Sequence, residues 1–406
     1  MNKLVLIVLT LVIAGCRQNG QIKVSKPITL SKGAASGAYF TKDHRGNSVL
    51  CWTAGERGTE HLVYSIYNRE SRGFGQPVLI PAGGINVSPE TMNKIAFKDD
   101  GTIVAVFAQK HPTPRNKFAG SLMFTQSFDN GLTWTNAKFV HTDTLRDNSR
   151  SYFDLATLPD GEVAIVWLDG RLRKGKDGSS LFFAKTNGTN GFLADKILSE
   201  TVCQCCRTDI YVDVQSNIHV VYRDVESRLE GQVRDFAHIA SDNNGDTFTA
   251  ANKISNDNWL VDGCPHTGAS LSSCGNKLQA CWFTAAGVPG LYFSESDNRG
   301  VDFAPRQLVS ETGRHPQLAA VGEQLVMVWQ EAPPDDQARS GHHAHHSEGT
   351  NGGGIIFSTK GSCDNLFKKI SIDSEGEFPV VTTTGNKGIL VAYTKSDRII
   401  VRHIEL

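Results

Sequence analysis

Cysteine and histidine residues form the most distinctive chemical pattern in this sequence. Cys203, Cys205 and Cys206 stand almost side by side, and Cys264 closely precedes His266. Thiolates and imidazoles are soft ligands that suit Cu(I) or Zn(II), and four of them complete a tetrahedral site. In an oxidising compartment the same thiols would instead form disulfides, with Cys203 or Cys206 paired to Cys264. The pattern therefore predicts either a metal site or structural disulfide bonds. The candidate metal ligands are Cys203, Cys205, Cys206, Cys264 and His266.

A histidine-rich segment offers a second, weaker set of metal ligands. Residues 341–346 have the sequence GHHAHH, within a stretch from Ala332 to Gly354 that is rich in Gly, Pro and His. Such tracts bind metal ions adventitiously. We expect a loop here that overhangs the same end of the fold as the cysteines.

Arginines that stand close to aspartates form a third pattern. It recurs as Arg150 with Asp154, Arg207 with Asp209, and Arg223 with Asp224. Clustered guanidinium groups bind carboxylate or phosphate bidentately, which would suit an anionic ligand. The alternating charges would equally form structural ion pairs between neighbouring segments. Both interpretations stay open for the candidate ligand-binding arginines, which are Arg150, Arg171, Arg207, Arg223 and Arg314.

All these residues are distributed along a repeat that runs through the whole chain. Each copy has a turn rich in Gly, Asp or Asn, followed by a short apolar segment that ends in an aromatic residue. The seven copies are Asn47–Trp52, Thr102–Phe107, Glu162–Trp167, Asn217–Tyr222, Lys277–Trp282, Gln324–Trp329 and Gly388–Tyr393. Each copy is typical of a buried strand, and strand-filled repeats of this length indicate the blades of a β-propeller.

A turn motif lies within three of the repeats. Ser127–Trp134 (SFDNGLTW) fits the pattern S-x-D-x-G-x-T-W in full, and Ser241–Phe248 and Ser296–Phe303 fit it more loosely. The short Asp or Asn side chain bonds back to its own backbone, and the glycine takes a positive φ, so the motif predicts a hairpin turn. We therefore assign Asp129 a structural role and not that of a catalytic acid.

On these repeats and motifs the chain resembles the BNR/Asp-box repeat family, which includes the exo-α-sialidases. The resemblance implies an all-β fold, a β-propeller of four-stranded antiparallel blades. Sialidases have six blades, but the repeats here favour seven, with six as the alternative. The last repeat, Phe378 to Leu406, has only three evident strands. We expect Lys26–Ser31 to supply the fourth strand and close the ring.

Blade topology predicts where chemistry would lie. If each blade runs from its inner strand outwards, the approaches to the first strands share one face with the loops that follow the second strands. The Asp boxes then lie on the opposite face. We expect the five arginines to converge on one mouth near the propeller axis.

The resemblance further implies a sialidase site. Arginines bind the sialic-acid carboxylate, an aspartate is the acid/base, and a tyrosine activated by a glutamate is the nucleophile. The matching candidates are Arg150, Arg207 and Arg314 for the cluster, Asp154 or Asp209 for the acid/base, and Tyr152 with Glu331 or Glu377 for the nucleophile. Such a site needs no cofactor.

The chain departs from the family at its first inner strand. Residues 33–40 (GAASGAYF) lack the F/Y-R-I-P motif and its arginine. Whether the protein is an enzyme therefore stays open. The expected function is binding, with or without hydrolysis, of an anionic glycan of the sialoside type. The alternative is a non-catalytic propeller with a Cu or Zn site or a protein-binding role.

The N-terminus predicts an exported bacterial lipoprotein. The apolar run Leu4–Ile13 is too short to span a membrane and suits a signal peptide, and Ile13–Cys16 (IAGC) resembles a lipobox. We expect a signal peptide over residues 1–15, lipidation at Cys16, a tether over 16–25, and one propeller domain over 26–406. The lipid would hold the protein in the cell envelope, on the periplasmic face or at the cell surface.

Composition narrows the class of partner. The chain has 41 Lys and Arg against 42 Asp and Glu and contains no basic run. Nucleic-acid binding usually needs a clustered basic face, so it is not expected. We expect a monomer whose partner is an anionic glycan or another carboxylate-bearing small molecule, and whose contact with the membrane is made through the lipid anchor only.

Overall fold

The computed structural model describes residues 22–56, 58–88, 90, 92–173, 178–261, 263–332, 353–361, 367–385 and 387–406. The expected signal peptide, Cys16, the histidines of residues 341–346 and Cys363 lie outside these residues. Within them, no helix is long and apolar enough to cross a membrane.

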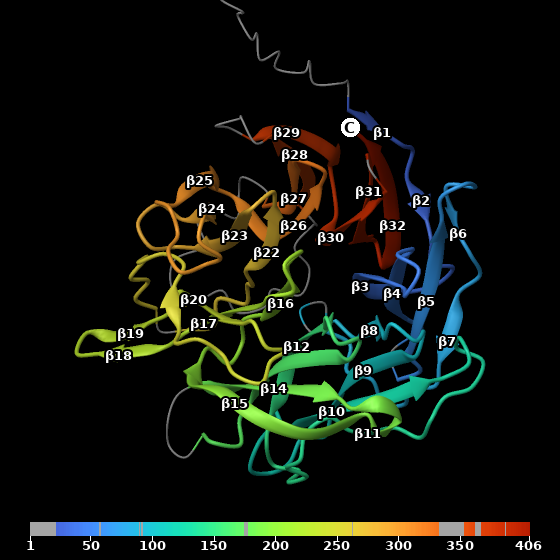
Figure 1. Ribbon diagram of the computed structural model, residues 1–406, viewed down its shortest axis with the longest axis horizontal. Helices are drawn as coiled ribbons and strands as arrows, with labels where there is room; N and C mark the ends of the chain where they lie inside the picture. The colour runs from blue at the N-terminus through green and yellow to red at the C-terminus, as the bar shows by residue number, and fades with distance from the viewer. Residues whose placement is uncertain are drawn as a thin grey trace, which may run out of the picture.

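Seven antiparallel sheets stand around a central axis as the blades of a propeller (Figure 1). Blade 1 contains β3 (Ala35–Lys42), β4 (Ser48–Ala54), β5 (His61–Asn68), β6 (Gly73–Phe74) and β7 (Val78–Ile80). Blade 2 contains β8 (Lys94–Phe97), β9 (Ile103–Lys110), β10 (Gly120–Ser127) and β11 (Lys138–Phe139). Blade 3 contains β12 (Arg150–Thr157), β13 (Val163–Asp169), β14 (Ser179–Thr186) and β15 (Phe192–Val202), with a short 3-10 helix at Gly188–Asn190.

The remaining blades follow the same plan. Blade 4 contains β16 (Asp209–Val212), β17 (Ile218–Arg223), β20 (Phe236–Ser241) and β21 (Asn252–Lys253), and it carries a projecting hairpin of β18 (Glu226–Arg228) and β19 (Gly231–Val233). Blade 5 contains β22 (Ser270–Cys274), β23 (Lys277–Thr284), β24 (Gly290–Ser296) and β25 (Gln307–Ser310). Blade 6 contains β26 (Gly313–Val321), β27 (Gln324–Glu331), β28 (Gly354–Gly361) and β29 (Lys368–Asp373).

Blade 7 joins the two ends of the described chain. Its strands are β30 (Glu377–Thr384), β31 (Gly388–Lys395) and β32 (Arg398–Glu405), and β1 (Lys23–Val24) and β2 (Ile28–Thr29) pair with β32. The N–H of Leu30 donates to the carbonyl of Ile399 at 2.8 Å. The prediction of seven blades, closed by the segment around Lys26–Ser31, is therefore confirmed. The chain enters this sheet at Lys23, within the expected tether.

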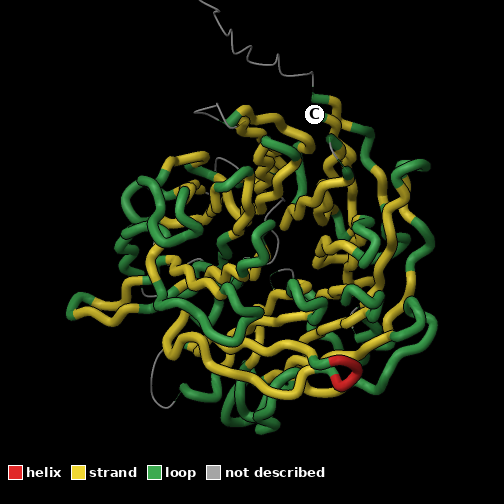
Figure 2. The backbone as a smooth tube through the Cα atoms, in the orientation of Figure 1, coloured by secondary structure: helices red, strands yellow, loops and turns green. Residues whose placement is uncertain are grey.

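The second strand of every blade is the repeat strand predicted from the sequence. Its terminal aromatic residue is at most 2 % exposed in all seven blades: Trp52, Phe107, Trp167, Tyr222, Trp282, Trp329 and Tyr393. Seven hydrophobic clusters combine residues of two neighbouring blades each, so the core consists of the interfaces between blades. Strands fill most of the described trace, as Figure 2 shows. Packing between neighbouring blades therefore stabilises the ring, and the inner strands line its axis.

The Asp boxes form hairpin turns between the third and fourth strands, as predicted. In the first box, Asp129 Oδ1 accepts from the backbone N of Thr133 at 2.8 Å, and Ser127 Oγ accepts from the N of Gly131 at 2.8 Å. Gly131 has a φ of 87°, and a Cβ there would collide with Tyr64 of blade 1. The glycine therefore permits both the turn and its contact with the next blade, and Asp129 is fully used by the turn.

We predict that Leu30→Pro destabilises the closed ring, because it deletes the N–H that donates to Ile399. The expected loss of unfolding free energy, relative to Leu30→Ala, is about 1–3 kcal/mol. Denaturant unfolding of both variants measures it, and Leu30→Ala controls for the lost side-chain packing. Equal stability of the two variants would contradict a role for this bond in closure.

Candidate functional site

Each inner strand has one residue at an equivalent position. This residue pairs with the second-strand residue that comes just before the terminal aromatic of the repeat. We call these seven residues the axial ring: Tyr39, Lys94, Asp154, Asp209, Ser270, Gln317 and Val380. All of them except Val380 are among the residues that line a central cavity of about 620 Å³. A volume of 300–1,000 Å³ is usual for small-molecule sites, so the cavity has room for a sugar.

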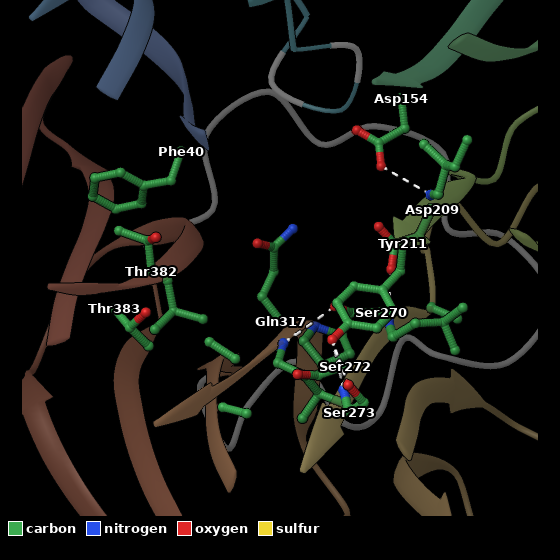
Figure 3. Close-up of a pocket in the computed structure, with 18 of the residues that line it drawn as sticks. Phe40, Asp154, Asp209, Tyr211, Ser270, Ser272, Ser273, Gln317, Thr382 and Thr383 are labelled. Carbon is green, nitrogen blue, oxygen red and sulfur yellow. Dashed lines mark hydrogen bonds between the residues drawn. The ribbon is translucent and has the colours of Figure 1, made fainter. Parts of the chain in front are cut away.

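Hydroxyl groups cover much of the cavity wall beyond the axial ring (Figure 3). Ser272 and Ser273 come from blade 5, and Thr382 and Thr383 come from blade 7. Tyr211 of blade 4 accepts from the backbone N of Ser273 at 3.1 Å, and its Oη lies 2.6 Å from the Oγ of Ser273. Hydroxyl donors and acceptors of this kind match those of a sugar.

Two carboxyl groups of the axial ring share one region of the wall. Asp154 Oδ2 accepts from the N of Ile210 at 3.1 Å, and Asp209 Oδ2 accepts from the N of Leu271 at 2.6 Å. Burial, together with the neighbouring Asp154 carboxylate, raises the pKa of Asp209 well above its usual range. Lys94 Nζ lies 3.3 Å from Asp154 Oδ1 and balances that charge. Asp209 therefore favours its protonated form beside the Asp154 carboxyl group, which lies within ion-pair distance of Lys94.

Arg207 places a positive charge in the cavity wall, and its guanidinium contacts His315. It donates to Nδ1 of His315 at 3.3 Å, and burial, followed by the charge of Arg207, lowers the pKa of His315 well below its usual range. Among the described residues no carboxylate lies within 4.0 Å of the Arg207 guanidinium. Burial also lowers the pKa of Arg207, although an arginine stays protonated. The charges of Glu90, Asp209 and Asp154 counteract this lowering at longer range, but within the described part of the chain none of them forms an ion pair with Arg207.

A glycine lets Arg207 cross from blade 4 to blade 6. A Cβ on Gly268 of blade 5 would lie 2.7 Å from Cβ and 3.4 Å from Nε of Arg207. Any larger residue would collide with Cβ of Arg207 and crowd its backbone carbonyl, and would shift the side chain that reaches His315. The receiving residue is also specially placed, because His315 has a φ of 51° at a register shift between Arg314 and Gln317. Bulges of this kind re-aim a side chain.

Two of the other predicted arginines are held by ion pairs. Arg150 Nη2 lies 2.5 Å from Asp143, and its Nε lies 3.3 Å from Asp169. Arg171 Nη2 lies 2.7 Å from Asp169 and 2.9 Å from Asp195. Burial lowers the pKa of Arg171, but the hydrogen bonds to both carboxylates outweigh this and raise it. The ion-pair interpretation therefore describes these two arginines, with partners other than Asp154.

The last two predicted arginines lie against aromatic rings. Arg223 is 2 % exposed, donates to the carbonyls of Arg234 and Phe283 at 2.9 Å each, and lies over the ring of Trp259. Arg314 lies over the ring of Phe283, with its Cζ 3.7 Å from the centroid. Of the five arginines, the structure places Arg207 among the described residues that line the cavity.

Tyr152 has a carboxylate partner that the sequence did not suggest. Its Oη donates to Glu90 Oε2 at 3.4 Å, and His266 Nδ1 lies 2.8 Å from the same oxygen. Burial, followed by the charge of Glu90, raises the pKa of Tyr152, so the phenol keeps its proton. Glu90 comes just before the inner strand of blade 2. The blade topology places such positions at the mouth, so this position could have indicated Glu90 as a candidate.

The predicted partners of Tyr152 lie elsewhere. Glu331 Oε1 accepts from Ser310 at 2.7 Å and from Thr312 at 2.8 Å, which fixes the start of blade 6. Glu377 begins β30, where burial, followed by the charge of Asp397, raises its pKa. No described hydrogen bond joins either glutamate to Tyr152, so the structure does not assemble the predicted tyrosine–glutamate pairs.

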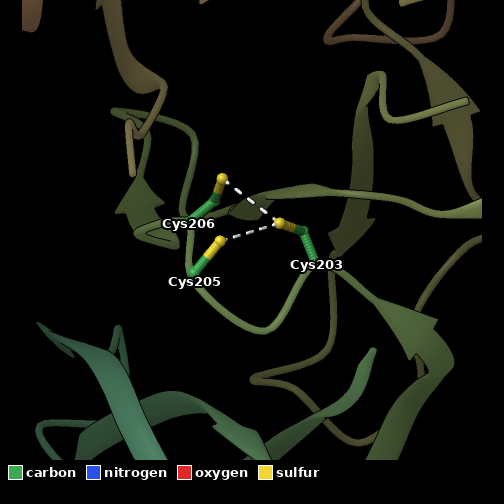
Figure 4. Close-up of side chains that lie close together, drawn as sticks. All are labelled: Cys203, Cys205 and Cys206. Carbon is green, nitrogen blue, oxygen red and sulfur yellow. Dashed lines mark hydrogen bonds between the residues drawn. The ribbon is translucent and has the colours of Figure 1, made fainter. Parts of the chain in front are cut away.

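The predicted thiols come together beside this tyrosine. We call Cys203, Cys205, Cys206 and Cys264 the sulfur cluster. Sγ of Cys203 lies 3.5 Å from that of Cys205 and 3.4 Å from that of Cys206, and the three point towards one another in Figure 4. Cys205, Cys264 and His266 form a second group whose ligand atoms all lie within 4.8 Å of one another. The seven described cysteines carry free thiols.

Comparisons with known proteins support the fold. No protein family model and no curated protein matches the chain. Among solved structures, the chain is similar to a protein of unknown function from Dyadobacter fermentans DSM 18053, at 14% identity over 95% of this chain and 99% of that one, with a TM-score of 0.52. It is also similar to the polysaccharide lyase Uly1, at 12% identity over 92% and 90% of the two chains, with a TM-score of 0.54. A PL25 ulvan lyase matches at 10% identity over 93% and 95%, also with a TM-score of 0.54.

We predict that Asp209→Asn removes a pH-dependent loss of stability. The folded-state pKa of Asp209 is raised, so its contribution is complete below the unfolded pKa and is lost as the pH rises through the folded value. The variant should gain stability over the native protein by up to about 1.4 kcal/mol per pH unit above about pH 4.

Denaturant unfolding across the acidic and neutral range measures this gain. Asp242→Asn, which alters an exposed carboxylate in the second Asp box, is the matched control. If Asp209→Asn and the native protein keep a constant difference in stability at every pH, Asp209 does not retain its proton.

Proposed function

We propose that this protein binds a carboxylate-bearing glycan in the central cavity, with Arg207 as the group that receives the carboxylate. One observation carries the proposal: the partly buried Arg207 lines the cavity, contacts His315 and has no carboxylate within ion-pair distance among the described residues. Buried charges in proteins are normally paired. A ligand carboxylate would supply the missing partner in bidentate geometry.

The rest of the cavity wall suits a sugar. Tyr211 lies beside the serines of blade 5 on one side of the cavity, and Phe40 lies beside the threonines of blade 7 on the other side. Hydroxyls would bond to the sugar hydroxyls, and aromatic rings would cover its apolar face. One propeller of similar fold is described as an ulvan lyase bound to a glycan containing GlcA, itself a carboxylated sugar. That neighbour supports the capacity of this fold for anionic glycans.

Hydrolysis of a sialoside is the specific form of the proposal. Asp209, whose pKa is raised, would act as the general acid, with the Asp154 carboxyl group beside it. A hydrolase of the sialidase type uses a tyrosine as its nucleophile in place of a second carboxylate. Tyr152 with Glu90 at the mouth is the pair that the structure offers in place of Glu331 or Glu377.

The proposal includes the expected location. An exported propeller, held in the cell envelope by a lipid on Cys16, would meet glycans outside the cell. This part rests on the sequence of residues 1–16 alone.

We predict that Arg207→Ala weakens binding of a carboxylated sugar about 10- to 100-fold, because a charge-assisted hydrogen bond contributes about 1.5–3 kcal/mol. Calorimetry with N-acetylneuraminic acid and with a glucuronate-containing oligosaccharide measures binding, and a fluorogenic sialoside measures turnover. Arg115→Ala is the control, because it removes the same charge from a surface side chain that is 86% exposed.

The outcomes separate the two levels of the proposal. Turnover that Arg207→Ala abolishes would establish a sialidase that lacks the usual first arginine motif. Binding without turnover would establish a glycan-binding propeller. If neither sugar binds the native protein, or if Arg207→Ala and Arg115→Ala bind equally well, the proposal is wrong.

We also predict that Gly268→Ala lowers carboxylate binding towards the level of Arg207→Ala, because the added Cβ collides with Cβ of Arg207 and displaces its side chain. Gly263→Ala, whose Cβ would meet nothing within 4 Å, is the matched control in the same segment. Calorimetry with the carboxylated sugar and thermal unfolding of both variants provide the readout. Unchanged binding in a folded Gly268→Ala variant would show that the path of Arg207 across blade 5 does not matter.

A further inference from the structure

We propose that the sulfur cluster binds a thiophilic metal ion, Cu(I) or Zn(II), beside the propeller mouth. Cys203, Cys205 and Cys206 form the core of the site, and Cys264 and His266, which form a second group with Cys205, complete the coordination. The thiols and His266 are not among the residues that line the glycan cavity, and metal binding does not depend on the proposed function. Binding is an exchange in which each coordinating thiol releases its proton to solvent and its thiolate donates to the metal ion. No oxidant or reductant is consumed.

The first argument is the convergence of three sulfur atoms on one point. The chain turns tightly between β15 and β16, which brings Cys205 and Cys206 back to Cys203. The Sγ separations of 3.4 and 3.5 Å resemble those between ligands that share one metal ion with bonds of about 2.3 Å. All three thiols are at most 4 % exposed, so water competes little for the site.

The second argument is the composition of the cluster, in which most of the side chains are thiols. The other hydrophobic clusters consist mainly of aliphatic and aromatic side chains from two blades. The one formed by these thiols contains Cys203, Cys205, Cys206 and Val225, with Tyr152 and Cys264 against it. By contrast, Cys51 and Cys281 lie singly in the repeat strands and pack as small apolar residues.

The third argument is the arrangement of His266. Its Nδ1 bonds to Glu90 Oε2 at 2.8 Å, which orients the ring. An imidazole that donates from Nδ1 carries its lone pair on Nε2, and a carboxylate behind a histidine is the usual support of a metal ligand. Cys264 is half-buried, so it provides a route from solvent to the buried thiols.

The fourth argument is the balance of charge around the thiolates. Arg234 Nη1 donates to Sγ of Cys203 at 3.4 Å, and Gln204 Nε2 donates to Sγ of Cys264 at 3.6 Å. A site with three or four thiolates around Cu(I) or Zn(II) carries net negative charge. Arg234 would offset that charge in surroundings with little water.

The test is metal uptake by the reduced protein under anaerobic conditions. Cu(I) is titrated against the chromogenic chelator bicinchoninate, and Zn(II) against a zinc indicator dye, so the two arms identify the preferred ion. We expect tight uptake of one of the two ions. Cys206→Ser should lower the affinity at least about 100-fold, and Glu90→Gln about 10- to 100-fold.

Matched variants keep the test decisive. Cys274→Ser removes a half-buried thiol outside the cluster and should bind like the native protein. Cys264→Ser changes the most accessible ligand and is the variant least able to disturb folding, so it stands in if Cys206→Ser misfolds. All variants retain the histidines of residues 341–346. Any adventitious metal binding by these histidines therefore contributes equally to every variant and cancels in the comparison.

Three results would overturn the proposal. The first is no uptake of either ion by the reduced protein. The second is equal uptake by Cys264→Ser and Cys274→Ser. The third is protein, purified under native conditions, in which mass spectrometry finds Cys203 bonded to Cys206 and Cys205 bonded to Cys264.

Discussion

The hydrogen bonds that join the N-terminal strands to β32 close the ring, and the rest of the structure depends on that closure. Once seven blades stand around one axis, each inner strand must place one equivalent residue there. Seven interfaces between blades bury the apolar side chains. Polar residues of the inner strands can therefore lie at the axis. In this chain the axial ring includes Lys94, Asp154, Asp209 and Gln317, so the closed ring surrounds a polar cavity.

Charge balance then decides what the cavity can hold. Lys94 pairs with Asp154, and the pKa of Asp209 is raised, so Arg207 is a cation that has no carboxylate within ion-pair distance among the described residues. Glu90, Tyr152 and His266 join three different blades at the mouth, and His266 also lies beside the sulfur cluster. An anion site on the axis and a soft-metal site at its edge are thus neighbours built on the same ring of inner strands.

Much of this fold was predictable, because its signals are local. Each repeat strand and each Asp box carries its own buried pattern or turn chemistry, and the incomplete last repeat indicated that the N-terminus must close it. Arg207, Asp154, Asp209 and the thiols were found because they lie at or just before inner strands. The pairing of Arg150 with Asp143, and of Tyr152 with Glu90, was not predictable, since blade geometry and strand bulges set those contacts, not spacing along the chain.

The central claim is that Arg207 binds the carboxylate of a ligand. One comparison of affinities tests it most directly. Calorimetry would measure binding of N-acetylneuraminic acid, or of a glucuronate-containing oligosaccharide if that is the ligand, beside the matching methyl ester, which keeps the sugar but removes the charge. The account predicts that the acid binds and that the ester binds at least about 10-fold more weakly, the difference expected for a charge-assisted hydrogen bond. Equal affinity of acid and ester for the native protein would contradict it.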